Sequence, residues 1–122
     1  YLTFASNTPV QYAFSDIMDQ PDLYLGLGAF YQEKRDLFLE LMKSSRFKPL
    51  PCHGTYFQMM DYSEISTEND VAFAKHMTRE KGVAAIPPSF FYHESDDHKV
   101  LRFCFAKRDE TLEQAAEVLC RI

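Results

Sequence analysis

The sequence predicts a layered α/β unit with a helical N-terminal arm. Three observations carry this prediction: an apolar stripe at helical spacing in residues 23–41, strongly β-prone segments at 55–62 and 99–106, and a last amphipathic helix from Asp109. Side chains three and four residues apart share one face of a helix, and alternate side chains share one face of a strand. The two periods follow one another along the chain, which is typical of helices that cover a sheet.

Two helices are expected in the first third of the chain. Thr8 is the expected N-cap of a helix that runs to about Met18, with a proline at its first helical position. Asp22 is expected to cap a longer helix, whose apolar stripe consists of Leu23, Leu27, Phe30, Leu37, Phe38 and Leu41. Gly26 and Gly28 lie inside this helix, and each costs up to about 1 kcal/mol relative to alanine. A bend or a frayed first part is therefore expected.

A sheet is expected in the remaining two thirds. Strands are predicted at 47–50 and 55–62, and the second has largely apolar side chains on both sides, so it should lie centrally in a covered sheet. Thr67 followed by Asp70 resembles a capping box, and the helix that it opens should end at Gly82. The remaining expected elements are a short strand at 83–86, a loop at 89–97, a strand at 99–106 and a helix capped by Asp109.

Composition excludes several classes of protein. The chain has 122 residues, of which 46% are hydrophobic and 15% aromatic, enough for a real core in one domain. Its net charge of −5 argues against a nucleic-acid partner. No apolar run approaches the roughly 20 residues of a membrane span, and no secretory signal is recognisable. The chain begins with Tyr1 rather than Met, inside a β-prone segment, so it is expected to be a piece of a longer protein.

The three cysteines predict a cellular compartment. Cys52, Cys104 and Cys120 are odd in number and widely spaced. A disulfide framework more often shows an even number of closely spaced cysteines. Reduced thiols in a cytoplasmic protein are therefore expected.

Arg102 is the most informative candidate for a functional residue. In the strand at 99–106, Leu101, Phe103 and Phe105 share one side, and Arg102 shares the other with small apolar residues. A guanidinium group in apolar surroundings needs a partner, and its planar fork matches a carboxylate. Two partners remain open from the pattern alone: a structural salt bridge to one of the acidic residues, or a carboxylate ligand.

Other polar clusters predict no chemistry. The four histidines show no metal-ligand spacing, so no metal site is expected. Cys52 and His53 are adjacent, which on a strand would place them on opposite sides and argues against a nucleophile pair.

An ordered set of short motifs identifies a family. The motifs are Thr3-Phe4 with Asn7-Thr8-Pro9-x-Gln11, Tyr31-x-x-Lys34-Arg35-Asp36, Gly54-Thr55-Tyr56-Phe57, Gly82 to Ser89 with Phe91-Tyr92, and Leu101 to Lys107. Together they resemble the class I/II, fold-type I aminotransferases that use pyridoxal 5′-phosphate (PLP), with the kynurenine, glutamine and methionine aminotransferases as the nearest branch. Each motif is weak, but their common order along the whole chain is specific.

This resemblance implies a place in a larger enzyme. Residues 1–21 would form the end of the large PLP-binding domain, and residues 22–122 the interdomain helix plus the C-terminal small domain, with a small mixed or antiparallel sheet. Arg102 would bind the substrate α-carboxylate, Tyr56 would stand at the pocket wall, and Phe91 would lie on the loop that covers the cleft. Phe4 would lie near the active site of the partner subunit.

The resemblance also implies what the chain lacks. The family's Schiff-base lysine lies in a Ser-x-x-Lys context that no lysine here has, so it is expected upstream, with no catalytic residue in this piece and no activity of the piece alone. The whole enzyme would be a homodimer that uses PLP, an amino acid and a 2-oxo acid. The alternatives are a PLP-dependent cysteine-conjugate β-lyase on the same scaffold and a non-catalytic α/β binding domain.

Overall fold

The structure is a computed structural model that describes residues 5–94 and 96–122. The chain divides into two compact units between Phe30 and Tyr31. The first unit contains α1 (Thr8–Met18), α2 (Asp22–Leu25) and the first turn of α3 (Leu27–Leu41). The break between α2 and α3 falls at Gly26, which confirms the bend expected from the two glycines. The assignment of residues 1–21 to a large domain stays a prediction.

The expected starts of the first and last helices differ slightly from the structure. Asn7, not Thr8, occupies the N-cap position of α1, and its side chain makes no capping hydrogen bond. Arg108, not Asp109, precedes α5 (Asp109–Leu119), which places Asp109 in the first turn. A carboxylate in the first turn still interacts favourably with the positive end of the helix dipole.

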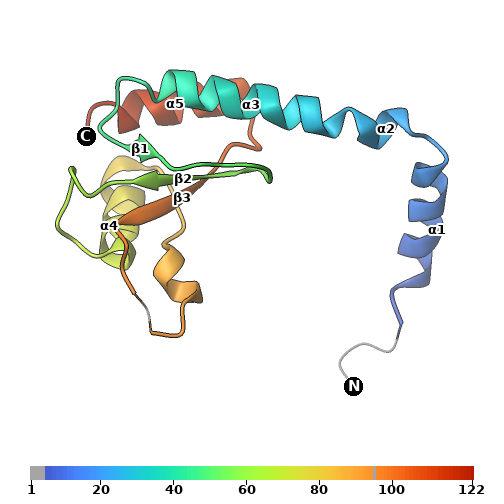
Figure 1. Ribbon diagram of the computed structural model, residues 1–122, viewed down its shortest axis with the longest axis horizontal. Helices are drawn as coiled ribbons and strands as arrows, with labels where there is room; N and C mark the ends of the chain where they lie inside the picture. The colour runs from blue at the N-terminus through green and yellow to red at the C-terminus, as the bar shows by residue number, and fades with distance from the viewer. Residues whose placement is uncertain (1–4, 95) are drawn as a thin grey trace. The chain divides into compact units, whose positions relative to one another are not determined.

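The second unit is built on a three-stranded antiparallel sheet (Figure 1). Its strands are β1 (Lys48–Pro49), β2 (Phe57–Asp61) and β3 (Val100–Cys104), in the order β1-β2-β3. The central position of β2 confirms the expectation from its two apolar sides, and the antiparallel pairing agrees with the fold expected from the resemblance.

The segment expected as a strand at 83–86 pairs with the sheet at one point only. Ile86 forms an isolated antiparallel bridge with Arg102, and the two backbone N–H···O distances are 3.0 and 2.9 Å. Pro87 and Pro88 follow directly. Because proline has no N–H group to donate, the ladder ends there.

The helix after the sheet's central strand consists of α4 (Asp70–His76) and a π-helical turn, η1 (Met77–Lys81). The predicted cap at Thr67 is wrong: Asn69 precedes α4, and its side chain accepts a hydrogen bond from the Ala72 N–H at 2.8 Å. The helical segment ends at Gly82, whose φ of 71° is left-handed as expected for a C-terminal glycine.

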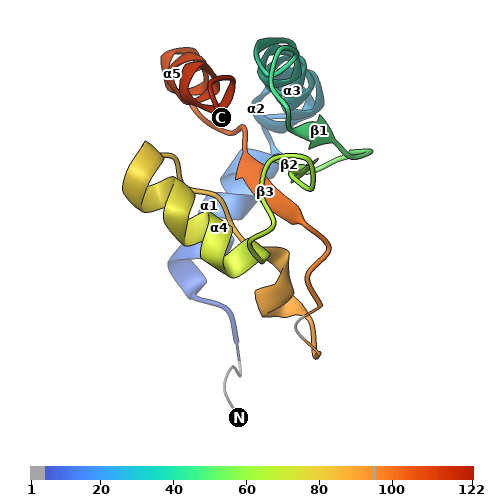
Figure 2. The ribbon, with the colours of Figure 1, turned by 90° about the vertical axis from the view of Figure 1, so that its left-hand side faces the viewer.

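The hydrophobic core lies on one face of the sheet. Leu101, Phe103 and Phe105 are buried there, as the alternation along this strand predicted. They pack with Met42, which directly follows α3, and with buried residues of α3, α4, η1 and α5, among them Phe38, Phe73, Met77, Leu112, Ala116 and Leu119. Figure 2 shows α4 and α5 beside the strands, and both views show α3 and α5 next to each other.

A salt bridge of 2.6 Å between Lys34 and Asp109 joins α3 to the start of α5. The helices cover the face of the sheet that carries the core, and the side chain of Arg102 lies on the opposite face.

Candidate functional site

Arg102 is the third residue of β3, and its strand neighbours place it on the face opposite the core. It pairs with Met59 of β2 on one side and with Ile86 on the other. Its immediate neighbours Leu101 and Phe103 are exposed by 0% and 4%, whereas Arg102 is only half-buried. The pairing with β2 and the bridge to Ile86 thus fix the backbone from which the guanidinium group projects.

The guanidinium group of Arg102 is held by aromatic rings. Its Cζ lies 4.2 Å from the centre of the Phe57 ring and 5.4 Å from that of Phe91. A cation over an aromatic face is attracted by the ring quadrupole, by about 0.5–2 kcal/mol. Both rings therefore stabilise the half-buried guanidinium group.

The guanidinium group of Arg102 forms no side-chain hydrogen bond within residues 5–94 and 96–122. Its Nε is buried and has no hydrogen-bond partner. No carboxylate in this part of the chain forms a salt bridge with its guanidinium group. A buried donor without a partner costs about 1–3 kcal/mol, so the geometry favours an acceptor that comes from elsewhere.

Tyr56 stands next to this arrangement. It precedes β2, and its side chain is 44% exposed. Its ring lies 4.4 Å from that of Phe57 and 6.0 Å from that of Tyr31 on α3. Its carbonyl accepts a hydrogen bond from the Phe105 N–H at 3.1 Å. The ring of Tyr56 is thus linked to Arg102 through Phe57.

Phe91 ends a short 3₁₀ helix, η2 (Pro88–Phe91), in the segment expected to be a loop. Its side chain is 67% exposed on one side while it faces Arg102 on the other. The predicted site residues Arg102, Tyr56 and Phe91 therefore lie in one neighbourhood. Phe4, the fourth predicted residue, lies outside the described residues.

The segment after Phe91 is attached to the sheet through Asp97 and Lys99. The Lys99 ammonium lies 2.7 Å from the Asp97 carboxylate, and the Lys99 N–H donates to the same carboxylate at 2.9 Å. Burial raises the pKa of Asp97, but these hydrogen bonds and the charge of Lys99 lower it more, so its pKa is below the ordinary value. The ammonium also donates to the carbonyls of Thr67 and Glu68.

Phe57 contacts Arg102 but was not among the site residues predicted from the sequence. Its side chain, like that of Met59, belongs to the face of β2 that pairs with Arg102 and Cys104. The available signal was the alternation along the strand, which placed Phe57 and Met59 together. The register that brings Phe57 to Arg102 is a long-range property.

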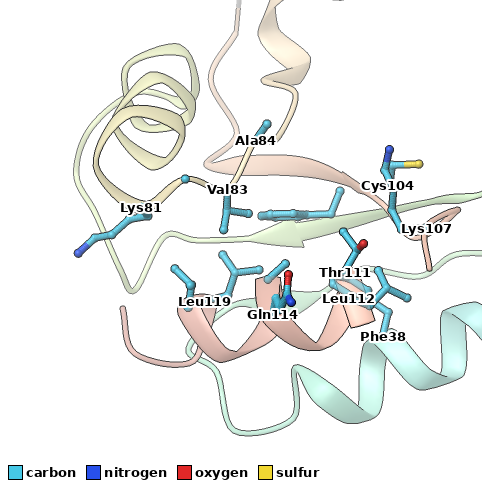
Figure 3. Close-up of a pocket in the computed structure, with 14 residues that line it drawn as sticks. Phe38, Lys81, Val83, Ala84, Cys104, Lys107, Thr111, Leu112, Gln114 and Leu119 are labelled. Carbon is cyan, nitrogen blue, oxygen red and sulfur yellow. The ribbon is translucent and has the colours of Figure 1, made fainter. Parts of the chain in front are cut away.

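A separate cavity of about 400 Å³ lies between α5 and the segment that follows η1 (Figure 3). Val83, Phe103, Leu112 and Leu119 give it apolar walls, and Arg102 is not among the residues that line it. The cavity and the Arg102 neighbourhood are therefore different places.

The described residues contain no group of three or more histidines, cysteines or acidic side chains that could hold a metal ion. In the same part of the chain, every helix is too short or too polar to cross a bilayer.

The profile of the family described as aminotransferase class I and II matches residues 2–119. A methionine aminotransferase from Escherichia coli strain K12 is 49% identical over 120 residues, which are 98% of this chain and 31% of the relative. A kynurenine–oxoglutarate transaminase from Dictyostelium discoideum is 33% identical over 100% of this chain and 33% of its own length. The chain thus spans about a third of the length of the curated relatives that it matches.

Solved structures are similar over the same region. The crystal structure of YbdL from Escherichia coli, for which a methionine aminotransferase function has been identified, has a TM-score of 0.90 and 48% identity, covering 100% of this chain and 32% of that one. An N-succinyldiaminopimelate aminotransferase from Mycobacterium tuberculosis has a TM-score of 0.84 and 28% identity, over 99% of this chain and 32% of that one.

Proposed function

The chain belongs to the class I and II aminotransferases and corresponds to a portion of an enzyme related to the methionine and kynurenine aminotransferases, and we propose that Arg102 binds the α-carboxylate of the amino-acid substrate. The observation that carries the proposal is the buried Nε of Arg102, which has no hydrogen-bond partner among the described residues. One oxygen of a carboxylate would accept the hydrogen bond from Nε, and the other would accept one from a second N–H of the guanidinium group.

The aromatic rings around Arg102 suit this role. The ring centre of Phe57 lies 4.2 Å from Cζ of Arg102, and the N–H groups of Arg102 would donate two parallel hydrogen bonds to the carboxylate. The ring centre of Phe91 lies 5.4 Å from Cζ, and Phe91 is itself exposed to an incoming ligand. Holding the carboxylate in this way would orient the rest of the amino acid, and orientation contributes several kcal/mol to catalysis.

We propose that Tyr56 and Phe91 face the side chain of the substrate. Both are aromatic and partly exposed beside Arg102. Apolar walls with one charged anchor are the usual composition of a small-molecule site. Amino acids of the methionine, glutamine, kynurenine or aromatic type are the proposed donors, with 2-oxo acids as acceptors.

PLP, the cofactor that the family implies, does not fit the described residues of this chain. Four of the seven lysines are ion-paired, namely Lys34, Lys43, Lys48 and Lys99. The other three, Lys75, Lys81 and Lys107, are exposed. We propose that other parts of the whole enzyme hold PLP, and that this chain alone is inactive.

A homodimer and a cytoplasmic location are proposed for the whole enzyme. The exposed apolar side chains of α1, such as Tyr12 and Phe14, support a further subunit or domain as their cover. The free thiols of Cys52, Cys104 and Cys120 support a reducing compartment.

The test is the Arg102→Lys variant of the whole enzyme, assayed with amino acids and with the matching amines. Lysine keeps the charge and loses the planar fork. Losing one partner of a desolvated charge pair costs about 2–5 kcal/mol, so kcat/KM for amino acids should fall roughly thirty- to several-thousand-fold. The loss should be small for amines, which have no carboxylate.

The exposed Arg79 supplies a matched control, since Arg79→Lys should leave kcat/KM unchanged for both amino acids and amines. A melting curve of each variant completes the experiment. Equal losses for amino acids and amines, together with a clear fall in Tm, would show that Arg102 has a structural role only.

A further inference from the structure

A buried polar pair lies between α4 and η2. Asp70, the first residue of α4, is 2% exposed, and Ser89 of η2 is 4% exposed. The Asp70 carboxylate accepts two hydrogen bonds from Ser89: from its hydroxyl at 2.6 Å and from its backbone N–H at 2.8 Å. Both oxygens of the carboxylate are thus used by one residue, and hydrogen bonds to a charged group are the stronger kind.

This pair is one of the hydrogen-bonded attachments of the segment from Ile86 to Tyr92. At one end, Ile86 is bound to Arg102 through two backbone hydrogen bonds. In the middle, Ser89 is bound to Asp70, and its carbonyl accepts the N–H of Tyr92 at 3.1 Å. The segment therefore has a defined path over the edge of the sheet.

The position of Phe91 depends on this path more than on packing of its own ring. Two-thirds of the Phe91 side chain is exposed, yet its ring centre lies 5.4 Å from the Arg102 guanidinium group. A side chain with so little burial contributes little to holding itself in place. Ser89, two residues earlier in the same turn, is the buried point that holds it.

We propose that Asp70 is a positioning residue for the Arg102 site, acting through Ser89 to hold Phe91 against the guanidinium group. The role of Asp70 rests on the proposed binding of a substrate carboxylate by Arg102. Neither Asp70 nor Ser89 would touch the substrate. Their effect would be to keep the aromatic shield of the ion pair in place before the substrate arrives.

Ser89→Ala in the whole enzyme is the informative variant. It removes the hydroxyl bond but keeps the backbone bond to Asp70, so the fold should survive. We expect KM for an apolar amino acid to rise about tenfold while kcat changes less than about twofold, because substrate binding and not the chemical step is weakened. Ser89→Thr keeps a hydroxyl and should restore a substantial part of the affinity.

A double-mutant cycle tests whether the effect passes through Phe91. In a Phe91→Ala background, Ser89→Ala should change KM by less than about twofold, because there is no ring left to position. Asn69→Ala is the matched control: it removes the cap of the same helix and should lower Tm comparably, but Asn69 forms no hydrogen bond with Ser89 and should leave KM unchanged.

The positioning role is overturned if the Ser89 and Phe91 losses multiply independently, if Asn69→Ala raises KM as much as Ser89→Ala, or if KM of Ser89→Ala is unchanged. Failure of the carboxylate-binding role is a different result, namely equal losses for amino acids and amines in Arg102→Lys. Increased hydrogen exchange of the 86–92 amides in Ser89→Ala would support the attachment independently of activity.

Discussion

Thr55 has a backbone conformation that is unusual for its type. Its φ is 66°, in the left-handed region, and a β-branched side chain there is strained by about 1–2 kcal/mol. The strained residue directly precedes Tyr56 and Phe57, two of the aromatic residues around Arg102. Strain of this kind persists where the surrounding structure fixes the chain, and it clusters at functional sites.

Thr55→Gly should therefore stabilise the protein. Glycine removes the strain, and the greater freedom of the unfolded chain offsets part of the gain, which leaves about 0.5–1 kcal/mol. A rise in Tm of the whole enzyme checks this. Thr67→Gly is the control, because Thr67 is also exposed but has no left-handed φ, and that substitution should lower Tm. A lower Tm for Thr55→Gly would mean that the strain is absent in solution.

Arg102 could be recognised from the sequence, but its surroundings could not. Alternation along one strand separates Arg102 from its apolar neighbours and is a local property. The contact with Phe57 depends on the register between two strands some forty residues apart, which no local pattern contains. With 18 acidic residues in the chain, the sequence left a salt bridge open as well. Only the three-dimensional arrangement shows that none of the described carboxylates reaches Arg102.

The segment that connects η2 to β3 contains an ion pair between Asp97 and Lys99 directly before β3. Asp97 has a lowered pKa in the folded protein because of Lys99, although burial acts in the opposite direction. The unfolded state therefore binds more protons in acid than the folded state does. The Asp97 carboxylate stabilises the folded protein above its unfolded pKa of about 4, and this contribution is lost as the pH falls through the lower pKa of the folded state.

Asp97→Asn should lower Tm near neutral pH, and in acid its Tm should approach that of the parent. The difference in Tm between the parent and the variant should narrow steadily below about pH 4. The exposed neighbour Asp96 provides the control, since Asp96→Asn should show little difference at any pH. Thermal melts from pH 3 to pH 7 give the answer, and a difference that stays constant over this range would contradict the role of the Asp97–Lys99 pair.

Element boundaries were predictable where one residue decides them. Gly82 ends η1 and Gly26 interrupts the helix before α3, each at its predicted place. The cap of α4 was predicted incorrectly because Thr67 and Asn69 both have suitable side chains, and only Asn69 reaches the Ala72 N–H. The strand at 83–86 was overpredicted: its residues are β-prone, but only Ile86 pairs with the sheet.

The family was predictable because its motifs are spread in order along the whole chain. The profile match over residues 2–119 confirms that prediction. A single motif such as Gly54-Thr55-Tyr56-Phe57 would not have sufficed. The place of Phe4 and the domain boundary at residue 21 stay predictions.

The isolated chain should bind no PLP covalently at a defined position. Its described lysines are ion-paired or exposed, and an ordinary lysine is protonated near neutral pH and therefore a poor nucleophile. The purified chain mixed with PLP and treated with borohydride should show no stoichiometric label by mass spectrometry and no turnover. A single labelled lysine accompanied by transamination would contradict the expectation.

The isolated chain should also self-associate. All residues of α1 are exposed, including Tyr12, Phe14 and Ile17, and apolar side chains grouped in this way promote association. Light scattering after size exclusion should show species larger than a monomer. The double substitution Phe14→Ser with Ile17→Ser should shift the chain toward the monomer. Asp16→Asn, which changes an exposed polar residue of the same helix, should leave the association unchanged. A monomer of the parent chain would refute this.

The two outer edges of the sheet, at β1 and β3, determine how such association can occur. β1 has only two residues, and one of them is Pro49. The outer side of β3 is occupied at Arg102 by Ile86, and two prolines stop that pairing from growing. A strand from another molecule therefore finds no continuous row of free N–H and C=O groups to extend. Copies of this chain would meet through side chains, reversibly, and the sheet would not serve as a template for fibres.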